Sequence, residues 1–301
     1  MSGPSTEGAA ALHRLVQGET SDPDRVAFYC EVTGLDAASL ASAGIAGSAP
    51  VGREDLALAQ IIMAAYGHLP VSQVRGRLGS LKVMAASRIR AEAAAEPGLR
   101  RALGEVTIQA VEPGHAGFFA LDVLRLTHRR FDGSTSPVLR REVFLAGDAV
   151  TVLPYDPVRD RVLVIEQMRI GPLGRGDPLP WQIEAIAGRI DPGESPAAAA
   201  RREAVEEAGL TLGRLEKVAE YYPTPGAVSE YLYSYVALCD LPDSAAGHFG
   251  AEEEAEDIRG QLLSHAELMT ALARGEIGNA PLILTALWLD RERDRLRRGQ
   301  G

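Results

Sequence analysis

The sequence predicts a mixed α/β (α+β) protein of the α/β/α sandwich type, preceded by a mainly helical extension. Apolar residues recur at helical spacing between residues 53 and 96, and strand-like segments separated by turn residues begin near residue 104. Along the chain, one long helix is expected between the predicted strands, and two more helices are expected close to the C-terminus. Strands and helices that mix without strict βαβ alternation are typical of this class. We therefore divide the chain into an extension, residues 1–104, and a main domain, residues 105–301.

The extension is expected to be helical where it is ordered. Residues 1–52 are rich in Ala, Gly, Ser and Pro, and only the stretch 26–40 is expected to be ordered there. Residues 53–96 are typical of two helices interrupted at Leu69-Pro70. The second helix ends at Glu96-Pro97, because proline disfavours the α conformation in the residue before it. It would present one apolar stripe, made of Val71, Val74, Leu78, Leu81 and Met84.

In the main domain, the alternation of apolar and turn residues predicts the remaining elements. Strands are expected at 106–108, 118–127, 138–144, 149–155, 161–169, 215–222 and 230–238, and helices at 196–208, 265–274 and 280–297. The glycine-rich stretch 171–176 lacks the spacing of a phosphate-binding loop, and we expect it to be a flexible connection.

Composition excludes several classes of protein. The net charge of −10 argues against nonspecific nucleic-acid binding, which needs a basic surface. No apolar run approaches the ~18 residues that span a bilayer, and the first residues lack the layout of a secretory signal. Cys30 and Cys239 are too few and too far apart for a disulfide framework. We expect a cytoplasmic protein that contacts neither nucleic acid nor a membrane.

The segment from Gly188 to Leu210 carries the chemistry. Ser195 is a good N-cap, Pro196 suits the first helical position, and Gly209 can end the helix in a left-handed conformation. Near the end of this helix, Glu203 lies three and four positions before two further carboxylates, so the three share one face.

This acidic face is unfavourable for stability. Like charges at i,i+4 repel by a few tenths of a kcal/mol, and anions in the last turn oppose the helix dipole at about 0.3–1 kcal/mol. A hard divalent cation removes the conflict, because carboxylate oxygens are its preferred ligands. An isolated Glu-x-x-Glu-Glu is also compatible with a solvated acidic face.

The spacing decides between these interpretations. Gly188, Glu194 and the run Arg202–Leu210 resemble the Nudix box, G-x5-E-x7-R-E-U-x-E-E-x-G-U, at every fixed position, and only Ala204 is small for the apolar slot U. The resemblance implies a Nudix α/β/α sandwich with an N-terminal antiparallel β-sheet subdomain. It also implies a loop–helix–loop that holds Mg²⁺, for which Mn²⁺ can substitute, against a substrate diphosphate.

The same resemblance assigns roles within the box. It implies that Glu203 and Glu207 are metal ligands, that the carbonyl of Ala187 also binds metal, and that Glu206 is a catalytic group that binds metal or supports a ligand. Arg189 is expected to contact substrate. Arg202 and Glu194 are expected to pair and brace the loop.

Segments outside the box narrow the resemblance to bacterial ADP-ribose pyrophosphatases, over residues of about 106–297. Tyr222–Glu230 resembles their S-P-G-x-x-S-E stretch, with Thr224 in place of serine, and places Pro225, Gly226 and Glu230 against the substrate. The other similar segments are Gly117–Phe119, Arg140–Glu142, Leu153-Pro154, Ile165–Arg169, Glu252–Arg259 and Gly275–Leu289.

Each of these segments also has a structural interpretation. Phe118 and Phe119 are either core residues of a strand or, as we favour, include one that stacks on adenine. Arg141 and Glu142 are either a surface pair or groups that reach the nucleotide from the partner subunit of a homodimer. For Arg169 we favour a phosphate contact over a plain salt bridge.

The acidic run that begins at Glu252 is either a solvated loop or part of the catalytic centre. The resemblance makes Glu254 the general base and Glu256 a metal ligand, and these two roles can be exchanged in so dense a cluster.

The resemblance therefore predicts Mg²⁺-dependent hydrolysis of the diphosphate of ADP-ribose, which yields AMP and ribose 5-phosphate. The rival enzyme acts on another nucleoside diphosphate sugar, such as ADP-glucose or GDP-mannose, and the box does not separate the two. The rival from another class is a regulatory Nudix domain that binds ADP-ribose, but such domains tend to lose the box glutamates. The extension is expected to pack on the catalytic domain or to enlarge a dimer interface. Alternatively, because 26–31 resembles part of a γ-glutamylcyclotransferase-like domain, it is a shortened relic of one.

Overall fold

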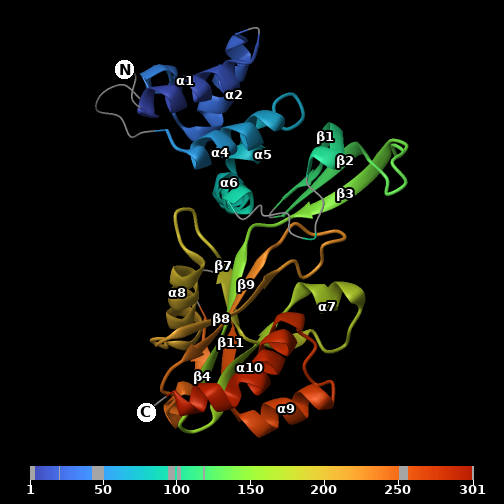
Figure 1. The fold of residues 1–301 in the computed structure, drawn as a ribbon. Helices are drawn as coiled ribbons and strands as arrows, with labels where there is room; N and C mark the ends of the chain where they lie inside the picture. Colours follow the sequence, from blue (N-terminus) through green and yellow to red (C-terminus); the bar gives the residue numbers. More distant parts are fainter. Residues whose placement is uncertain are drawn as a thin grey trace. The chain divides into compact units, whose positions relative to one another are not determined.

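The chain folds into two compact units, Met1–Gly147 with Thr224–Glu230 and Asp148–Pro223 with Tyr231–Gly301 (Figure 1). The computed structural model describes residues 4–19, 21–42, 51–93, 99, 103–117, 119–250 and 257–299. The boundary expected between residues 104 and 105 lies within the first unit, because a small β-sheet groups there with the N-terminal helices. As a division of function, that boundary stays a prediction.

In the described residues up to Ala93, six helices form the N-terminal part of the first unit, and they share one apolar core. They are α1 (Pro4–Gln17), α2 (Pro23–Thr33), α3 (Ala37–Ser42), α4 (Arg53–Ala64), α5 (Val71–Arg75) and α6 (Leu78–Ala93). The expectation that only residues 26–40 are ordered before residue 52 is wrong, because α1 forms. Its Leu12 and Val16, four positions apart, are buried against residues of α2 and α4, and tertiary packing of this kind stabilises helices of modest propensity. The break at Leu69-Pro70 is confirmed, but Gly76 and Arg77 divide the predicted second helix into α5 and α6.

A three-stranded antiparallel sheet completes the first unit. After the short helix η1 (Leu103–Glu105), strands β1 (Val106–Ala116), β2 (Ala120–His128) and β3 (Leu139–Leu145) pair in chain order. The segment 224–230 lies along β3, where the N–H of Phe144 donates to the Ala227 carbonyl at 2.8 Å and the N–H of Ser229 donates to the Phe144 carbonyl at 3.0 Å. The predicted N-terminal antiparallel subdomain is therefore confirmed.

The second unit is built on a mixed sheet. In the described part of the chain it has eight strands, with the order β10-β11-β5-β4-β9-β8, and β6 pairs with β5 while β7 pairs with β4. Its strands are β4 (Ala149–Asp156), β5 (Arg161–Met168), β6 (Trp181–Glu184), β7 (Ile186–Arg189), β8 (Leu215–Tyr221), β9 (Leu232–Leu238), β10 (Gly247–Phe249) and β11 (Ile258–Ser264).

Helices cover both faces of this sheet. Along β5, Leu163 and Ile165 belong to a core that contains the alanines of α8 (Pro196–Ala208), whereas Val162 and Val164 belong to a second core. The second core contains residues of α9 (His265–Ala273) and α10 (Ala280–Arg298). The α/β/α sandwich is confirmed. Among the residues that the structure describes, no helix is both long and apolar enough to cross a membrane.

Two connections differ from expectation. The stretch 171–176, expected to be a flexible connection, belongs to a short helix, α7 (Ile170–Arg175), which ends at Gly176 in the left-handed conformation. A short helix η2 (Asp243–Ala245) precedes β10.

Asp160, in the β4–β5 turn, attaches α10 to the sheet. Its carboxylate accepts hydrogen bonds from the Tyr155 hydroxyl and from Nε of Arg293, both at 2.8 Å, and pairs with Nη1 of Arg297 at 2.9 Å. The hydrogen bonds from Arg293 and Tyr155 hold the pKa of Asp160 well below its ordinary value.

We expect Asp160→Asn to lower the free energy of unfolding at pH 7 by about 1–3 kcal/mol, because an amide loses these charge-assisted bonds. The φ of 56° at this position is one that asparagine tolerates, so the substitution tests the charge and not the backbone. Since the folded-state pKa is depressed, the contribution is complete above the unfolded pKa of about 3.9 and is lost as the pH falls below it. Urea unfolding of both proteins at pH 7 and pH 3 measures this change.

The matched control is Asp243→Asn. This change breaks an ion pair between Asp243 and Arg161, and the carboxylate of Asp243 is almost fully exposed. We expect a change within about 0.5 kcal/mol. Equal losses in the two variants, or a loss at Asp160 that does not shrink between pH 7 and pH 3, would contradict the prediction.

Candidate functional site

Local signals in the sequence form helix α8 and set its length. The Ser195 hydroxyl accepts a hydrogen bond from the N–H of Ala198 at 3.2 Å, Pro196 is the first helical residue, and Gly209 caps the end with a φ of 61°. The alanine-rich side is buried in the core, and Ala204, the small residue at an apolar position of the box, is fully buried there. This packing leaves the acidic side of the last two turns facing β7.

Two of the three carboxylates on this side are buried. Glu203 and Glu207 are 9% and 3% exposed, respectively. One oxygen of Glu207 accepts the N–H of Ala187 in β7 at 3.0 Å. Glu203 lies against Gly188, where a Cβ atom would fall 1.8 Å from its Oε1. A glycine is therefore required at this position for the carboxylate to lie where it does.

Arg202 connects the acidic groups of the box. Its Nη1 donates to Glu203 and to Glu206, both at 2.8 Å, and its Nη2 donates to Glu194 at 3.0 Å and to the carbonyl of Arg189 at 2.9 Å. The expected brace between Arg202 and Glu194 is confirmed. The hydrogen bonds that Arg202 donates to Glu194, with its interactions with Glu203 and Glu206, raise the pKa of Arg202, so it stays protonated. Burial would raise the pKa of Glu194, but hydrogen bonds from Arg202 and the Asp191 N–H lower it overall.

The donor set of α8 fits a hard divalent cation. Two buried carboxylates on successive turns offer the oxygen ligands that Mg²⁺ prefers, and this ion keeps positions for water and substrate phosphates besides one or two protein carboxylates. Within the described ranges, no three His, Cys, Asp or Glu side chains are placed so as to hold a metal. Glu256, the further predicted ligand, and Glu254, the predicted general base, lie outside the described residues. The metal roles of Ala187, Glu203, Glu206 and Glu207 therefore stay predictions.

Arg169, directly after β5, pairs with a carboxylate that the sequence did not single out. Its Nε and Nη2 contact the same oxygen of Glu184 at 2.8 and 2.7 Å. The salt bridge is thus present, and the expected phosphate contact stays a prediction. Two positions earlier, Gln167 is buried, and its Nε2 has no partner among the described residues.

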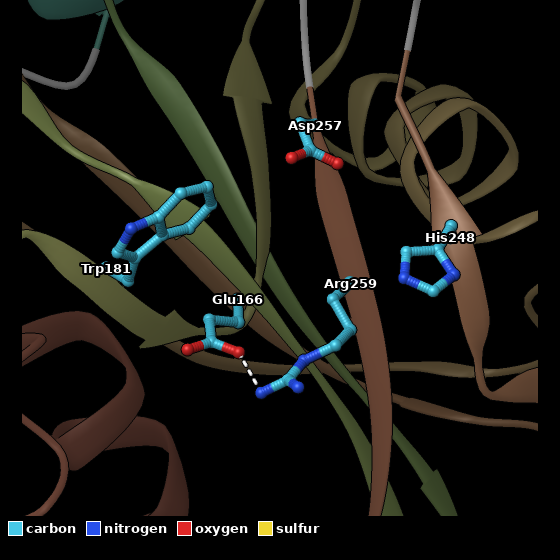
Figure 2. A pocket seen from close by; sticks show the side chains of 5 residues that line it. All are labelled: Glu166, Trp181, His248, Asp257 and Arg259. Carbon is cyan, nitrogen blue, oxygen red and sulfur yellow. Dashed lines mark hydrogen bonds and ion pairs between the residues drawn. The ribbon is translucent and has the colours of Figure 1, made fainter.

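A pocket of about 330 Å³ lies over the neighbouring strands β6, β5, β11 and β10. Figure 2 shows its lining residues, Glu166, Trp181, His248, Asp257 and Arg259, with an ion pair between Glu166 and Arg259. Trp181 is about half exposed there, which leaves an aromatic surface available to a ligand. None of these residues was predicted as a site residue. The available signal was Trp181, an aromatic residue that begins the alternating apolar and polar stretch Trp181–Glu184.

Like Arg169, Arg189 lies in the second unit, where it ends β7, whereas the other described residues of the predicted substrate set lie in the first unit. Phe119 packs on Phe144 of β3 with ring centroids 4.8 Å apart, and Phe118 lies outside the described residues. Glu142 of β3 forms an exposed ion pair with Arg140 at 2.5 Å, and Nη1 of Arg141 donates to the Arg140 carbonyl at 2.9 Å.

The segment that holds the other three predicted contacts lies beside the same strand. Pro225 and Gly226 form an exposed turn, closed by the N–H of Val228 on the Thr224 carbonyl at 3.0 Å, and Glu230 follows it. The structure thus gathers these residues around β3 and the box carboxylates around α8. The substrate contacts of Phe119, Arg141, Glu142, Arg169, Arg189, Pro225, Gly226 and Glu230 stay predictions.

Comparison with known proteins agrees with this architecture. The NUDIX domain family model matches residues 146–285, the range that contains α8 and the mixed sheet. An ADP-ribose pyrophosphatase of Escherichia coli strain K12 is 41% identical over 185 residues, which cover 62% of this chain and 88% of that protein. The chain belongs to the Nudix hydrolase family.

Relatives with another substrate in their names are also similar. A GDP-mannose pyrophosphatase of Citrobacter koseri is 32% identical over 150 residues, covering 50% of this chain and 77% of that protein. A solved structure of an ADP compounds hydrolase has 24% identity and a TM-score of 0.49, covering 64% of this chain and 98% of that chain.

Proposed function

We propose that this protein hydrolyses the diphosphate of ADP-ribose in a Mg²⁺-dependent reaction and releases AMP and ribose 5-phosphate. The observation that carries the proposal is the pair of buried carboxylates, Glu203 and Glu207, on the last two turns of α8. A buried carboxylate is costly unless a cation or hydrogen-bond donors compensate it. The similarity to an ADP-ribose pyrophosphatase over most of that protein's length supports ADP-ribose as the substrate.

We assign the following roles to the residues of the site. Glu203 and Glu207 would hold the metal. When bound, the metal neutralises the diphosphate and lowers the pKa of the water that attacks phosphorus. Arg202 holds Glu203 and Glu206 in place through its two hydrogen bonds. Arg169 binds a phosphate oxygen, and Glu254 takes the proton of the attacking water. No covalent intermediate is required.

A hydrolysis screen with Mg²⁺ tests the proposal. The compounds are ADP-ribose, ADP-glucose, GDP-mannose, NADH and diadenosine polyphosphates. We expect the highest kcat/KM for ADP-ribose, with AMP and ribose 5-phosphate as products. A kcat/KM at least tenfold higher for GDP-mannose would favour the second candidate, which the similarity to a GDP-mannose pyrophosphatase supports. Binding of ADP-ribose without turnover would favour the regulatory alternative.

The acidic loop gives a separate prediction. We expect Glu254→Gln to lower kcat by roughly 10²-fold or more, because the amide cannot accept a proton. We expect Glu256→Gln instead to raise the Mg²⁺ concentration needed for half-maximal activity. Titration of activity with Mg²⁺ in both variants separates the roles. The reverse pattern would exchange the two assignments, and two fully active variants would remove both.

We also propose a homodimer in the cytoplasm. The resemblance to the ADP-ribose pyrophosphatases supports it, because their residues equivalent to Arg141 and Glu142 reach the nucleotide of the partner subunit. Light scattering of the purified protein is expected to give twice the chain mass of 32.1 kDa. A value near 32 kDa at micromolar concentration would contradict the dimer.

A further inference from the structure

Glu184 is a buried carboxylate in the last position of β6. Its side chain is 7% exposed, and it lies opposite Ile165 of β5. Taking a carboxylate out of water costs several kcal/mol, and even a well-formed ion pair often does no better than compensate that cost. Stability therefore gives little reason for a charged residue in this position, where an apolar one would suit the neighbouring core.

The contacts of Glu184 fix one edge of the Arg169 guanidinium. Nε and Nη2 of Arg169 both point to Oε2, at 2.8 and 2.7 Å. The guanidinium is planar and rigid, so two contacts on one edge set the direction of the whole group. In the part of the chain that the structure describes, Nη1 has no partner, and the side chain is 41% exposed. One edge is thus held by protein, and the other is available to a ligand.

The other oxygen of Glu184 is held by the start of α10. Oε1 accepts a hydrogen bond from Nδ2 of Asn279 at 2.8 Å. The Oδ1 of the same amide accepts the N–H of Leu282 at 2.9 Å and caps the helix. Because the cap sets which way the amide faces, its NH₂ group is directed at Glu184. The carboxylate therefore has a donor on each oxygen and little freedom to rotate.

We propose that Glu184 is a positioning residue, which holds Arg169 with its free guanidinium edge presented to the diphosphate of the substrate. Asn279 supports this arrangement by fixing the carboxylate. The inference rests on the proposed function, since it takes the substrate of Arg169 to be a nucleoside diphosphate sugar. Glu184 does not contact the substrate in this arrangement and affects binding only through Arg169.

A double-mutant cycle on the full-length protein tests the proposal. We expect Arg169→Ala and Glu184→Ala each to raise KM for ADP-ribose by roughly tenfold or more, with kcat changed less than about threefold, because a phosphate contact made before and during reaction mainly affects binding. Since Glu184 acts through Arg169, the double variant should have a kcat/KM within about twofold of Arg169→Ala. Multiplication of the two single effects would overturn the proposal.

Two further variants separate positioning from folding. Glu184→Gln keeps an oxygen that accepts from Arg169, so we expect a smaller rise in KM than for Glu184→Ala, and it serves if Glu184→Ala does not fold. A further rise in KM when Glu184→Gln is added to Arg169→Ala would overturn the proposal. Glu216→Gln is the matched control, because Glu216 is a mostly buried carboxylate of β8 paired with Arg214 and Arg295. Its KM should stay unchanged.

The failure of this inference is distinguishable from that of the proposed function. If the wild type hydrolyses another compound of the screen and not ADP-ribose, the proposed substrate is wrong, and the cycle is measured with the compound that is hydrolysed. If the wild type hydrolyses ADP-ribose and Arg169→Ala leaves KM unchanged, the proposed function stands and the role of Glu184 is refuted.

Discussion

Replacing Glu207 by glutamine is expected to abolish hydrolysis and to leave the fold intact. The carboxylate is 3% exposed, and one oxygen accepts the N–H of Ala187 at 3.0 Å. The glutamine amide oxygen can still accept that hydrogen bond, so the contact between α8 and β7 persists. The negative charge that would hold the metal is lost, and we expect kcat to fall by roughly 10³-fold or more.

The stability of this variant gives a second readout. Because the buried charge is removed, the free energy of unfolding is expected to stay the same or to rise, and urea unfolding measures it. The control is Glu292→Gln, which replaces a partly exposed glutamate of α10 that pairs with Arg291 and Arg295. This variant should keep full activity. Full activity of Glu207→Gln, with saturation at the same Mg²⁺ concentration as the wild type, would remove the metal assignment.

Gly188→Ala is the second change with a large expected effect. The added Cβ would lie 1.8 Å from Oε1 and 2.0 Å from Cδ of Glu203, far inside any permitted contact. The carboxylate is the end of a flexible side chain, so it is expected to move while the backbone of β7 stays. A displacement of this size in a reacting centre costs about 10²-fold in rate, and we expect kcat to fall by that amount.

The cost in stability should be small by comparison, within about 1 kcal/mol, since only one side chain has to move. Gly174→Ala is the matched control, because nothing lies within 4 Å of its added Cβ and its φ is not positive. A Gly188→Ala protein as active as Gly174→Ala would show that the observed position of Glu203 is not needed for the reaction. Unfolding of Gly188→Ala would instead show that the backbone moves.

Local sequence signals predicted α8 to the residue. Ser195, Pro196 and Gly209 are sufficient to begin and end a helix, because each acts through hydrogen bonds or dihedral angles of its own neighbours. The same reasoning applies to α9 and α10, whose predicted ends fall within one residue of the observed ones. For such elements the sequence pattern and the structure depend on the same short-range physics.

Three of the strands that were not predicted are very short and depend on distant partners. Strands β6 and β7 have four residues each, and they exist as strands because β5 and β4 offer them edges to pair with. Strand β10 has three residues and forms on β11. Segments this short carry no periodicity that separates a strand from a loop.

The same distinction between local and distant interactions applies to the candidate site residues. The acidic face of α8 was predictable because its members are three and four positions apart on one helix. Glu184 was not, since its importance comes from Arg169, directly after the neighbouring strand β5, and from Asn279, 95 positions further along the chain. His248 is brought beside Arg259 only by the pairing of β10 with β11.

The return of residues 224–230 to β3 has a consequence for synthesis of the protein. The Ser229 hydroxyl contacts Ala146 across 83 positions, so the partner of β3 leaves the ribosome well after the strand itself. At about 5–20 residues per second, the backbone groups of Phe144 remain exposed for several seconds in the nascent chain. An open strand edge is a site of aggregation. Nascent chains stalled between residues 150 and 220 should therefore be the most dependent on chaperones.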